Sequence, residues 1–236
     1  MRRLILSTIL TLTILPSVRS AESNLELTKK GLQELNHLIG EWRGTGTPLG
    51  SPRERREGFW VEHLDWQWQF EKSSIWLRVD IKDGKYFKKG ELRYLPKEKK
   101  YKLTLTTKDK KTLVFQGEKE GRRLVLDRSD STAKQDHRMI FTLLHSNRYL
   151  FRYESKPSER TRYKKIYQVG VTKKDVPFAG KGDSYPECIV SGGRGTMAVS
   201  FKGKTYYVCC TGCRNEFNDN PEKYIKEYEA KQAKKK

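Results

Sequence analysis

The middle of the chain, from Phe59 to Val171, is a series of strand-like runs separated by short turn signals. Apolar and polar residues alternate in Leu77–Ile81 and in Lys102–Thr106, which is the period of a strand with one face on a core. The turns are rich in Lys, Asp, Gly and Asn, as in β-hairpins. The expected strands are Phe59–Trp66, Gln69–Ile81, Tyr86–Leu95, Lys102–Thr107, Thr112–Glu118, Arg122–Asp127, Arg138–Leu144, Tyr149–Ser155 and Tyr163–Val171.

Hairpin-linked strands with no helix between them would leave two long edges exposed in an open sheet. Closure into a barrel removes both edges. The sequence therefore predicts a mainly β fold class, in which an antiparallel up-and-down β-barrel forms the larger domain. Aromatic residues make up 11% of the chain, which suits the packing of such a fold.

A short amphipathic helix is expected ahead of the barrel. Leu25, Leu32, Leu35 and Ile39 recur at helical spacing, and Gly40 follows them as a terminating glycine would. This helix would plug or flank the barrel. His37, near its end, is interpreted as a capping or surface residue rather than a ligand.

The segment that opens the barrel has the pattern Gly40-x-Trp42-x-Gly44-x-Gly46. A helix, this pattern and a long antiparallel meander resemble lipocalin-type, calycin-like barrels, in which a Gly-x-Trp on the first strand closes one end of the barrel. The resemblance covers Leu32 to Gly170. It implies a cup that holds a small hydrophobic ligand or a haem.

The interior of the expected barrel is aromatic. A barrel of this size is equally well filled by its own side chains, and a filled core is the interpretation we favour. His137 and His145 are candidates to face a haem iron, although a histidine at a strand end is more often solvated. The chain has no Cys-x-x-Cys-His, which excludes a covalent c-type haem. The candidate lining residues are Trp60, Trp66, Trp68, Trp76, Phe115, Phe141 and Tyr153.

The N-terminus has the features of a cleaved secretory signal peptide over residues 1–20. It starts Met-Arg-Arg, continues with the apolar run Leu4–Leu15, and carries Val18 and Ser20 at the usual cleavage positions. The apolar run is shorter than the ~20 residues of a membrane-spanning helix. No cysteine stands near the cleavage site, which argues against a lipoprotein. The expected localisation is secreted or periplasmic.

The formal charge is +20, and loss of Arg2, Arg3 and Arg19 with the signal peptide would leave +17. Such a surplus draws a protein toward anionic surfaces, and in an exported protein the anionic cell envelope is a more plausible partner than nucleic acid. The basic residues are scattered, however, so solvated turns are the favoured interpretation and no specific nucleic-acid site is expected. They include Arg53, Arg55, Arg56, Lys97, Lys99, Lys100, Lys108, Lys110 and Lys111.

A second domain is expected after the barrel. Residues 172–183 carry Pro177, Gly180 and Gly182 among charges without periodicity, which indicates a linker. The expected divisions are a barrel domain at 21–171, a small α+β module at 184–230 and a basic tail at 231–236. Apolar residues make up only 35% of the chain, which favours two modest domains over one large core.

The small module contains every cysteine of the chain: Cys188, Cys209, Cys210 and Cys213. Thiolates suit a zinc or copper ion, and Cys210 and Cys213 form a Cys-x-x-Cys knuckle. Cys209 and Cys213 would share one face if the turn between them is already helical. In an exported protein the same residues can instead form two disulfides. The close spacing makes independent bridges cramped, so a metal site is the favoured hypothesis.

The spacing Cys188-x20-Cys209-x3-Cys213 combines with Gly203-Lys-Thr-Tyr-Tyr-Val-Cys and with Phe217-x3-Pro221-Glu-Lys-Tyr224. This combination resembles the YHS domain and the related TRASH-type heavy-metal modules. The resemblance covers Tyr185 to Tyr228. It implies metal binding, with Cys188, Cys209 and Cys213 as ligands and Cys210 as an extra or alternative thiolate. The resemblance also implies that the aromatic residues of the module form its small core.

The leading functional hypothesis is an exported metal-binding or metal-handling protein. The barrel shows no paired carboxylates, nucleophile elbow or metal-histidine motif, so no enzyme is expected. One alternative is a carrier or sensor of a small hydrophobic ligand or haem, with the cysteines as disulfide staples. Another is a thiol-redox protein that uses Cys210 and Cys213.

Overall fold

The computed structural model describes residues 17–145, 147–174 and 185–233 of the chain. Most of the expected signal peptide, most of the linker and the last three residues of the basic tail lie outside the described residues. Within the described part, no helix combines the length and the apolar character needed to cross a membrane.

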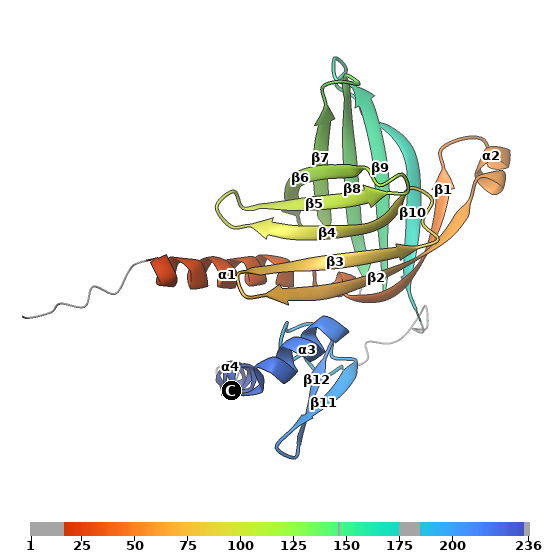
Figure 1. The fold of residues 1–236 in the computed structure, drawn as a ribbon. Coiled ribbons are helices and arrows are strands. Elements are labelled where there is room, and N and C mark those ends of the chain that lie inside the picture. Colours follow the sequence, from red (N-terminus) through yellow and green to blue (C-terminus); the bar gives the residue numbers. More distant parts are fainter. Residues whose placement is uncertain (1–16, 146, 175–184, 234–236) are drawn as a thin grey trace, which may run out of the picture.

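A closed barrel of ten antiparallel strands forms most of the structure (Figure 1). Each strand pairs with its neighbours in sequence, and β1 pairs with β10 to close the sheet. The mainly β fold class and the up-and-down barrel are therefore confirmed. The strands are β1 (Gly40–Pro48), β2 (Trp60–Glu71), β3 (Ser74–Lys82), β4 (Phe87–Leu95), β5 (Lys100–Thr107), β6 (Thr112–Glu120), β7 (Arg123–Asp130), β8 (Gln135–His145), β9 (Arg148–Pro157) and β10 (Lys164–Lys173).

The sequence placed the first hairpin of the meander wrongly. A break was expected between Trp66 and Gln69, but β2 continues through both residues because the alternation of buried and exposed side chains is maintained there. The turn to β3 lies at Lys72 and Ser73, which contain no glycine or proline. An arginine-rich stretch expected as a hairpin turn is the short helix α2 (Pro52–Glu57), whose N-terminus is capped by Ser51.

The N-terminal helix is longer than expected. Helix α1 (Ser17–Gln33) begins before Asn24, inside the expected signal peptide, and a 3-10 turn η1 (Asn36–Leu38) follows it. Gly40 does not terminate the helix itself. It is the first residue of β1 and has a φ of 111°, a conformation that glycine adopts readily.

Helix α1 and η1 close the lower end of the barrel. Leu32, Leu35 and Leu38 are fully buried there. The Nε1 of Trp42 donates a 2.6 Å hydrogen bond to the carbonyl of Leu38, so the tryptophan of the Gly-x-Trp pattern fixes this end as expected. The hydroxyl of Tyr101, in β5, donates to the carbonyl of Gly31 at 2.8 Å and so ties α1 to that strand.

The aromatic residues expected inside the barrel divide into three groups. Trp66, Trp68, Phe115 and Phe141 are buried in one continuous core. Trp60 and Tyr153 pack against that core and are only partly buried. Trp76 is buried but lies on the outer face of the barrel wall, not in its interior: it alternates with the inward-facing Leu77, and the guanidinium of Arg93 covers its ring, 4.3 Å from the centroid.

The two histidines considered as haem ligands lie near opposite ends of β8. The Nδ1 of His137 lies 2.8 Å from the hydroxyl of Tyr153. His145 is exposed, and its Nδ1 accepts a hydrogen bond from the amide of Asn147 at 3.3 Å. Strand residues rise about 3.3 Å each, so these two imidazoles cannot bind one haem together.

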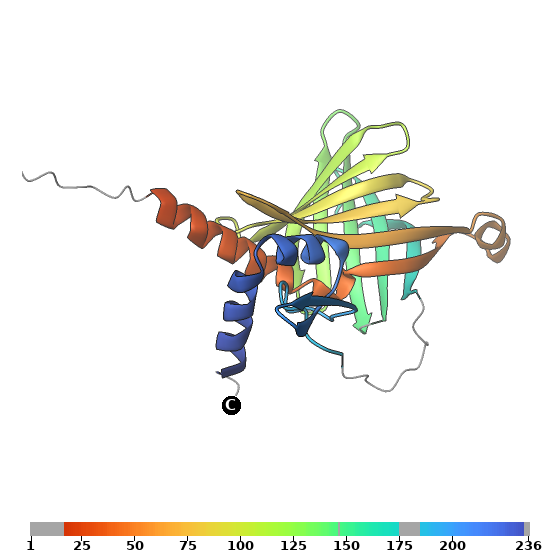
Figure 2. The same cartoon turned by 60° about the horizontal axis from the view of Figure 1, so that its bottom comes forward.

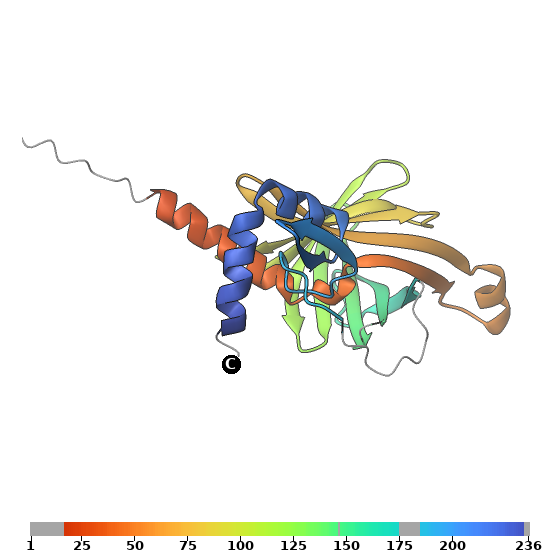
Figure 3. The same cartoon turned by 90° about the horizontal axis from the view of Figure 1, so that it is seen from below.

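The C-terminal module lies beneath the barrel, beside β2 and α1 (Figures 1 and 2). It consists of a hairpin, β11 (Met197–Phe201) and β12 (Lys204–Val208), followed by helices α3 (Thr211–Asp219) and α4 (Pro221–Ala233). Seen from below, α4 crosses α1 (Figure 3). Lys29 of α1 and Glu227 of α4 form a 3.6 Å ion pair.

Candidate metal centre

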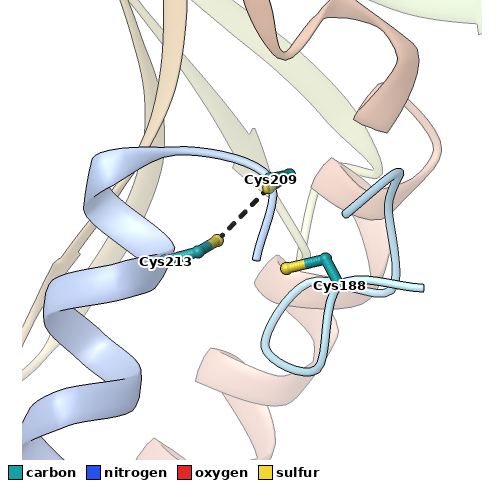
Figure 4. A group of neighbouring side chains, drawn as sticks. All are labelled: Cys188, Cys209 and Cys213. Carbon is teal, nitrogen blue, oxygen red and sulfur yellow. Dashed lines mark hydrogen bonds between the residues drawn. The ribbon is translucent and has the colours of Figure 1, made fainter. Parts of the chain in front are cut away.

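Three cysteine side chains converge at the junction between the module and the barrel. The Sγ atoms of Cys188, Cys209 and Cys213 all lie within 4.8 Å of one another, and Figure 4 shows them pointing toward a shared space. The Sγ atoms of Cys209 and Cys213 are 3.5 Å apart. All three residues are buried. The three residues that the YHS resemblance implies as ligands are therefore neighbours in the fold.

Cys188 reaches the cluster on a tight turn. Its amide donates to the carbonyl of Gly193 at 2.6 Å, and the amide of Gly192 donates back to the carbonyl of Cys188 at 2.8 Å. Gly192 has a φ of 72°, which lets the chain reverse. The amide of Ile189 donates to the carbonyl of Tyr207 at 2.9 Å and holds the turn against β12.

Cys209 and Cys213 are positioned by the step from β12 to α3. Cys209 follows the last residue of the strand, and Cys213 lies in the first turn of the helix. Cys209 precedes the extended residue Cys210 and so lies outside the helix, and the turn between strand and helix brings its Sγ to 3.5 Å from that of Cys213. A shared helical face was expected only if this turn were already helical; the turn is not helical, and the two sulfurs meet through the strand-to-helix turn instead.

Cys210 lies at the edge of the cluster. It precedes α3 with an extended backbone, φ −159° and ψ 171°, and its Sγ is 3.9 Å from that of Cys209. It is not one of the three mutually close sulfurs. A main-chain hydrogen bond from Trp68 also reaches its thiol, so Cys210 is where the cluster meets the barrel wall.

The pKa values of the four thiols are shifted in opposite directions. Hydrogen bonds from Cys209 and Cys213 lower the pKa of Cys188 to about 2 and the pKa of Cys210 to about 3. The hydrogen bonds that Cys209 makes to Cys188 and Cys210 raise its own pKa. Burial raises the pKa of Cys213. The cluster therefore concentrates thiolate charge in a buried place, and a cation between the sulfurs would offset it.

The spacing of the sulfurs fits a thiophilic ion. Zinc–sulfur bonds are about 2.3 Å long, so two sulfurs on one tetrahedral ion lie roughly 3.8 Å apart. The separations of up to 4.8 Å among Cys188, Cys209 and Cys213 are near that value. All four cysteines are free thiols in the structure. Three thiolates would hold the ion, and when bound it would supply Lewis acidity and a folding cross-link.

Ser191 is a part of the centre that the sequence analysis missed. It is fully buried, its amide donates to the Sγ of Cys188 at 3.4 Å, and its hydroxyl lies 3.3 Å from the Sγ of Cys209. Its carbonyl accepts hydrogen bonds from Gln33 and Asn36 at 3.0 and 2.9 Å. A polar residue three positions after a candidate ligand was the only signal in the sequence, and it is a weak one.

The family comparison bears on this module. The YHS domain family matches residues 194–228, a segment that contains β11, β12, α3 and part of α4. The C-terminal module is a YHS domain. Cys209 and Cys213 lie inside the matched segment of the YHS domain, and Cys188 precedes it.

Whole-chain comparisons add little to this. No curated protein matches the chain. Among solved structures, the chain is similar to one described as "Structure of EF1p2_mFAP2b bound to DFHBI", with 12% identity and a TM-score of 0.26, over 60% of this chain and 98% of that chain. The barrel ahead of the YHS domain is therefore defined by its own strand pairing.

Proposed function

We propose that this protein binds a thiophilic metal ion, zinc or copper(I), through the thiolates of Cys188, Cys209 and Cys213, and handles that ion outside the cytoplasm. The observation that carries the proposal is the convergence of three buried sulfurs from segments about twenty residues apart. Three soft ligands in one small space are typical of sites for these ions. The YHS domain at residues 194–228 supports the same role.

The proposed role is binding and transfer rather than catalysis of a reaction. Burial of the three sulfurs suits retention of an ion. Export is proposed from the signal-peptide features of residues 1–20, and it would place the site in the cell envelope or outside the cell.

Native mass spectrometry of the full mature chain, purified without chelator, tests metal binding. A bound ion raises the mass of the chain by its own mass less that of the thiol protons it displaces. Each disulfide instead lowers the mass by two hydrogens. We expect one ion per chain, and we expect cysteine alkylation to be blocked until a chelator is added. Two disulfides with no ion would contradict the proposal. A variant with Cys188, Cys209 and Cys213 all changed to Ser should bind none.

One observation favours a second function for the barrel. Glu62 and Tyr167 are 4% and 2% exposed, and the Oε1 of Glu62 and the hydroxyl of Tyr167 have no partner among the described residues. The ring of Tyr167 stacks on those of Tyr86 and Tyr153, with centroids 4.4 and 5.2 Å apart. We propose that a small ligand with a polar group binds at this aromatic end of the barrel.

Extraction of the purified protein into organic solvent, followed by mass spectrometry, tests this second function. A small molecule that is present with the unmodified protein and lost from a Glu62→Leu variant would support it. The same molecule in both samples, or none in either, would contradict it.

A further inference from the structure

A pocket of about 410 Å³ lies between the lower rim of the barrel and the YHS domain. Its walls come from η1, the start of β1, the end of β10 and the turn that precedes β11. This volume falls within the ~300–1,000 Å³ of small-molecule sites. Cys209 is one of its lining residues, so the pocket opens onto the cysteine cluster.

The lining of this pocket is cationic. Lys173, Lys174 and Arg194 face a single carboxylate, that of Glu41. Lys174 pairs with Glu41 at 2.7 Å. Within the described residues, neither Lys173 nor Arg194 forms an ion pair. Both partly buried cations therefore lack a carboxylate partner, and the cysteine cluster, through Cys209, is the other source of negative charge beside them. An anion in the cavity would pair with the two cations directly.

The contacts of these two cations hold them in place without neutralising them. The Nζ of Lys173 donates to the carbonyl of Ile39 at 2.9 Å and lies 4.9 Å from the ring centroid of Trp42. The guanidinium of Arg194 lies over the ring of Tyr185, 3.0 Å from its centroid. An ammonium group has three donors and a guanidinium five, so both can still donate to a ligand.

Two polar atoms at the pocket point to the same conclusion. The Nε of Arg194 and the Nε2 of His37 are buried and have no hydrogen-bond partner among the described residues. Both residues line the pocket. Buried nitrogen groups are rarely left unpaired in a folded protein. An oxygen acceptor on a ligand would pair with the Nε of Arg194, and with the Nε2 of His37 when that nitrogen carries the ring proton.

We propose that this pocket binds a small organic acid, whose carboxylate is held by Lys173 and Arg194 beside Cys209. A guanidinium matches a planar carboxylate with two parallel hydrogen bonds. The pocket has room for more than one carboxylate group, and Ile39 and Thr196 give it a less polar wall. A bound acid would lie next to the ion and affect its exchange; that consequence rests on the metal-binding function proposed above.

Calorimetric titration of the full mature chain tests the pocket, with succinate as the probe. Succinamide, of the same shape but neutral, and inorganic phosphate serve as comparison ligands. We expect succinate to bind about tenfold or more tightly than either, because one charge-assisted hydrogen bond accounts for at least that factor. Equal binding of succinate and succinamide, or tighter binding of phosphate, would overturn the proposal.

Matched variants locate the binding. Lys173→Gln and Arg194→Gln should each weaken succinate binding about tenfold. Lys164→Gln, at the other end of β10, and Arg162→Gln, in the exposed loop before that strand, should leave it unchanged. Arg194→Lys keeps the positive charge but cannot make the two parallel hydrogen bonds of a guanidinium, so we expect an intermediate affinity for succinate. This variant still tests the pocket if Arg194→Gln folds poorly. Succinate binding that all five variants retain would exclude the pocket.

The metal content of the same samples separates this proposal from the metal-binding function. Succinate binding to metal-free protein, lost in Lys173→Gln, supports the pocket whether or not an ion binds. A bound ion with no succinate binding overturns the pocket alone. Where both bind, transfer of the ion to a chelator should change in rate on addition of succinate and not of succinamide. An unchanged rate would show that the pocket does not act on the ion.

Discussion

Gly212, in the first turn of α3, lies directly against the main-chain carbonyl of Trp68 in β2. A Cβ atom at position 212 would overlap that oxygen. Next to it, the hydroxyl of Thr211 donates to the Oε1 of Gln67 at 2.7 Å. The helix that carries Cys213 is therefore seated on a barrel strand, and the barrel takes part in positioning the cluster.

Gly212→Ala should weaken the packing of α3 against β2. The added methyl group must displace α3 or bend β2, and overpacking of this kind costs about 1–3 kcal/mol. Denaturant unfolding would measure the loss, and we expect the affinity for the ion to fall with it. Gly170→Ala is the control, because its Cβ would meet only Leu150, at 3.6 Å. Equal stability of the two variants would contradict the close packing.

Cys210→Ser should keep one ion per chain, whereas Cys213→Ser should lose it. Cys213 is fully buried among the three close sulfurs, while Cys210 lies at the edge of the cluster and bonds to the barrel wall. Metal analysis after dialysis would measure both variants. Loss of the ion from Cys210→Ser would show that all four cysteines are required.

Much of the barrel could be predicted from the sequence because each strand carries its own period-2 pattern. The alternation in Leu77–Ile81 gives the inward face directly. The hairpin after β2 was misplaced because Lys72 and Ser73 carry no turn signal, and Trp76 was misassigned because apolar character alone does not tell which face a residue occupies. In both cases the register of a neighbouring strand decided the outcome.

The cysteine spacing predicted the cluster, but not its surroundings. Ser191, Asn36 and Lys173 reach the junction from three segments that are far apart in sequence. Their places depend on how the YHS domain packs against the barrel, and no local pattern encodes that contact. The basic pocket beside Cys209 is invisible in the sequence for the same reason.

Removal of the ion should loosen the YHS domain more than the barrel. A ligand that binds only the folded state adds RT ln(1 + [L]/Kd), about 4 kcal/mol at a thousandfold excess over Kd. The ion would contact only residues of the small module, and without it the buried thiolates repel one another. Hydrogen exchange with and without chelator should show lost protection in α3 and β12 and little change in β5 and β6. A uniform change across the chain would contradict this.

The neutral state of His37 should make stability depend on pH. Burial, together with the charges of Lys119 and Lys173, lowers its pKa from 6.5 to about 4. Between those values the unfolded chain binds a proton that the folded chain does not, so stability falls as the pH drops from 6.5 to 4. The loss from this group is at most about 3 kcal/mol.

Unfolding of metal-free protein at pH 7 and pH 4.5 would measure this effect. His37→Gln should lose less stability on acidification than the unmodified chain does. His145→Gln, at the exposed end of β8, is the control and should match the unmodified chain. The same pH dependence in all three proteins would contradict a buried neutral imidazole.

Asn36, in η1, bonds both to barrel strand β2 and to the turn that carries Cys188. Asn36→Ala should therefore lower both the stability of the protein and its affinity for the ion. Its Oδ1 accepts from the Nε1 of Trp68 at 3.1 Å, and its Nδ2 donates to the carbonyl of Ser191 at 2.9 Å. The change leaves the indole donor unpaired, at a cost of about 1–3 kcal/mol. It also releases one of the two side chains that hold Ser191, which contacts Cys188 and Cys209.

Thermal unfolding and ion affinity would be measured together for Asn36→Ala. Both should fall, whereas Asn215→Ala, on the exposed face of α3, should leave both unchanged. Lower stability with an unaltered affinity for the ion would show that Asn36 supports only the barrel. In that case the turn carrying Cys188 is held by its own main-chain hydrogen bonds to Gly193 and Tyr207, independently of η1 and the lower end of the barrel.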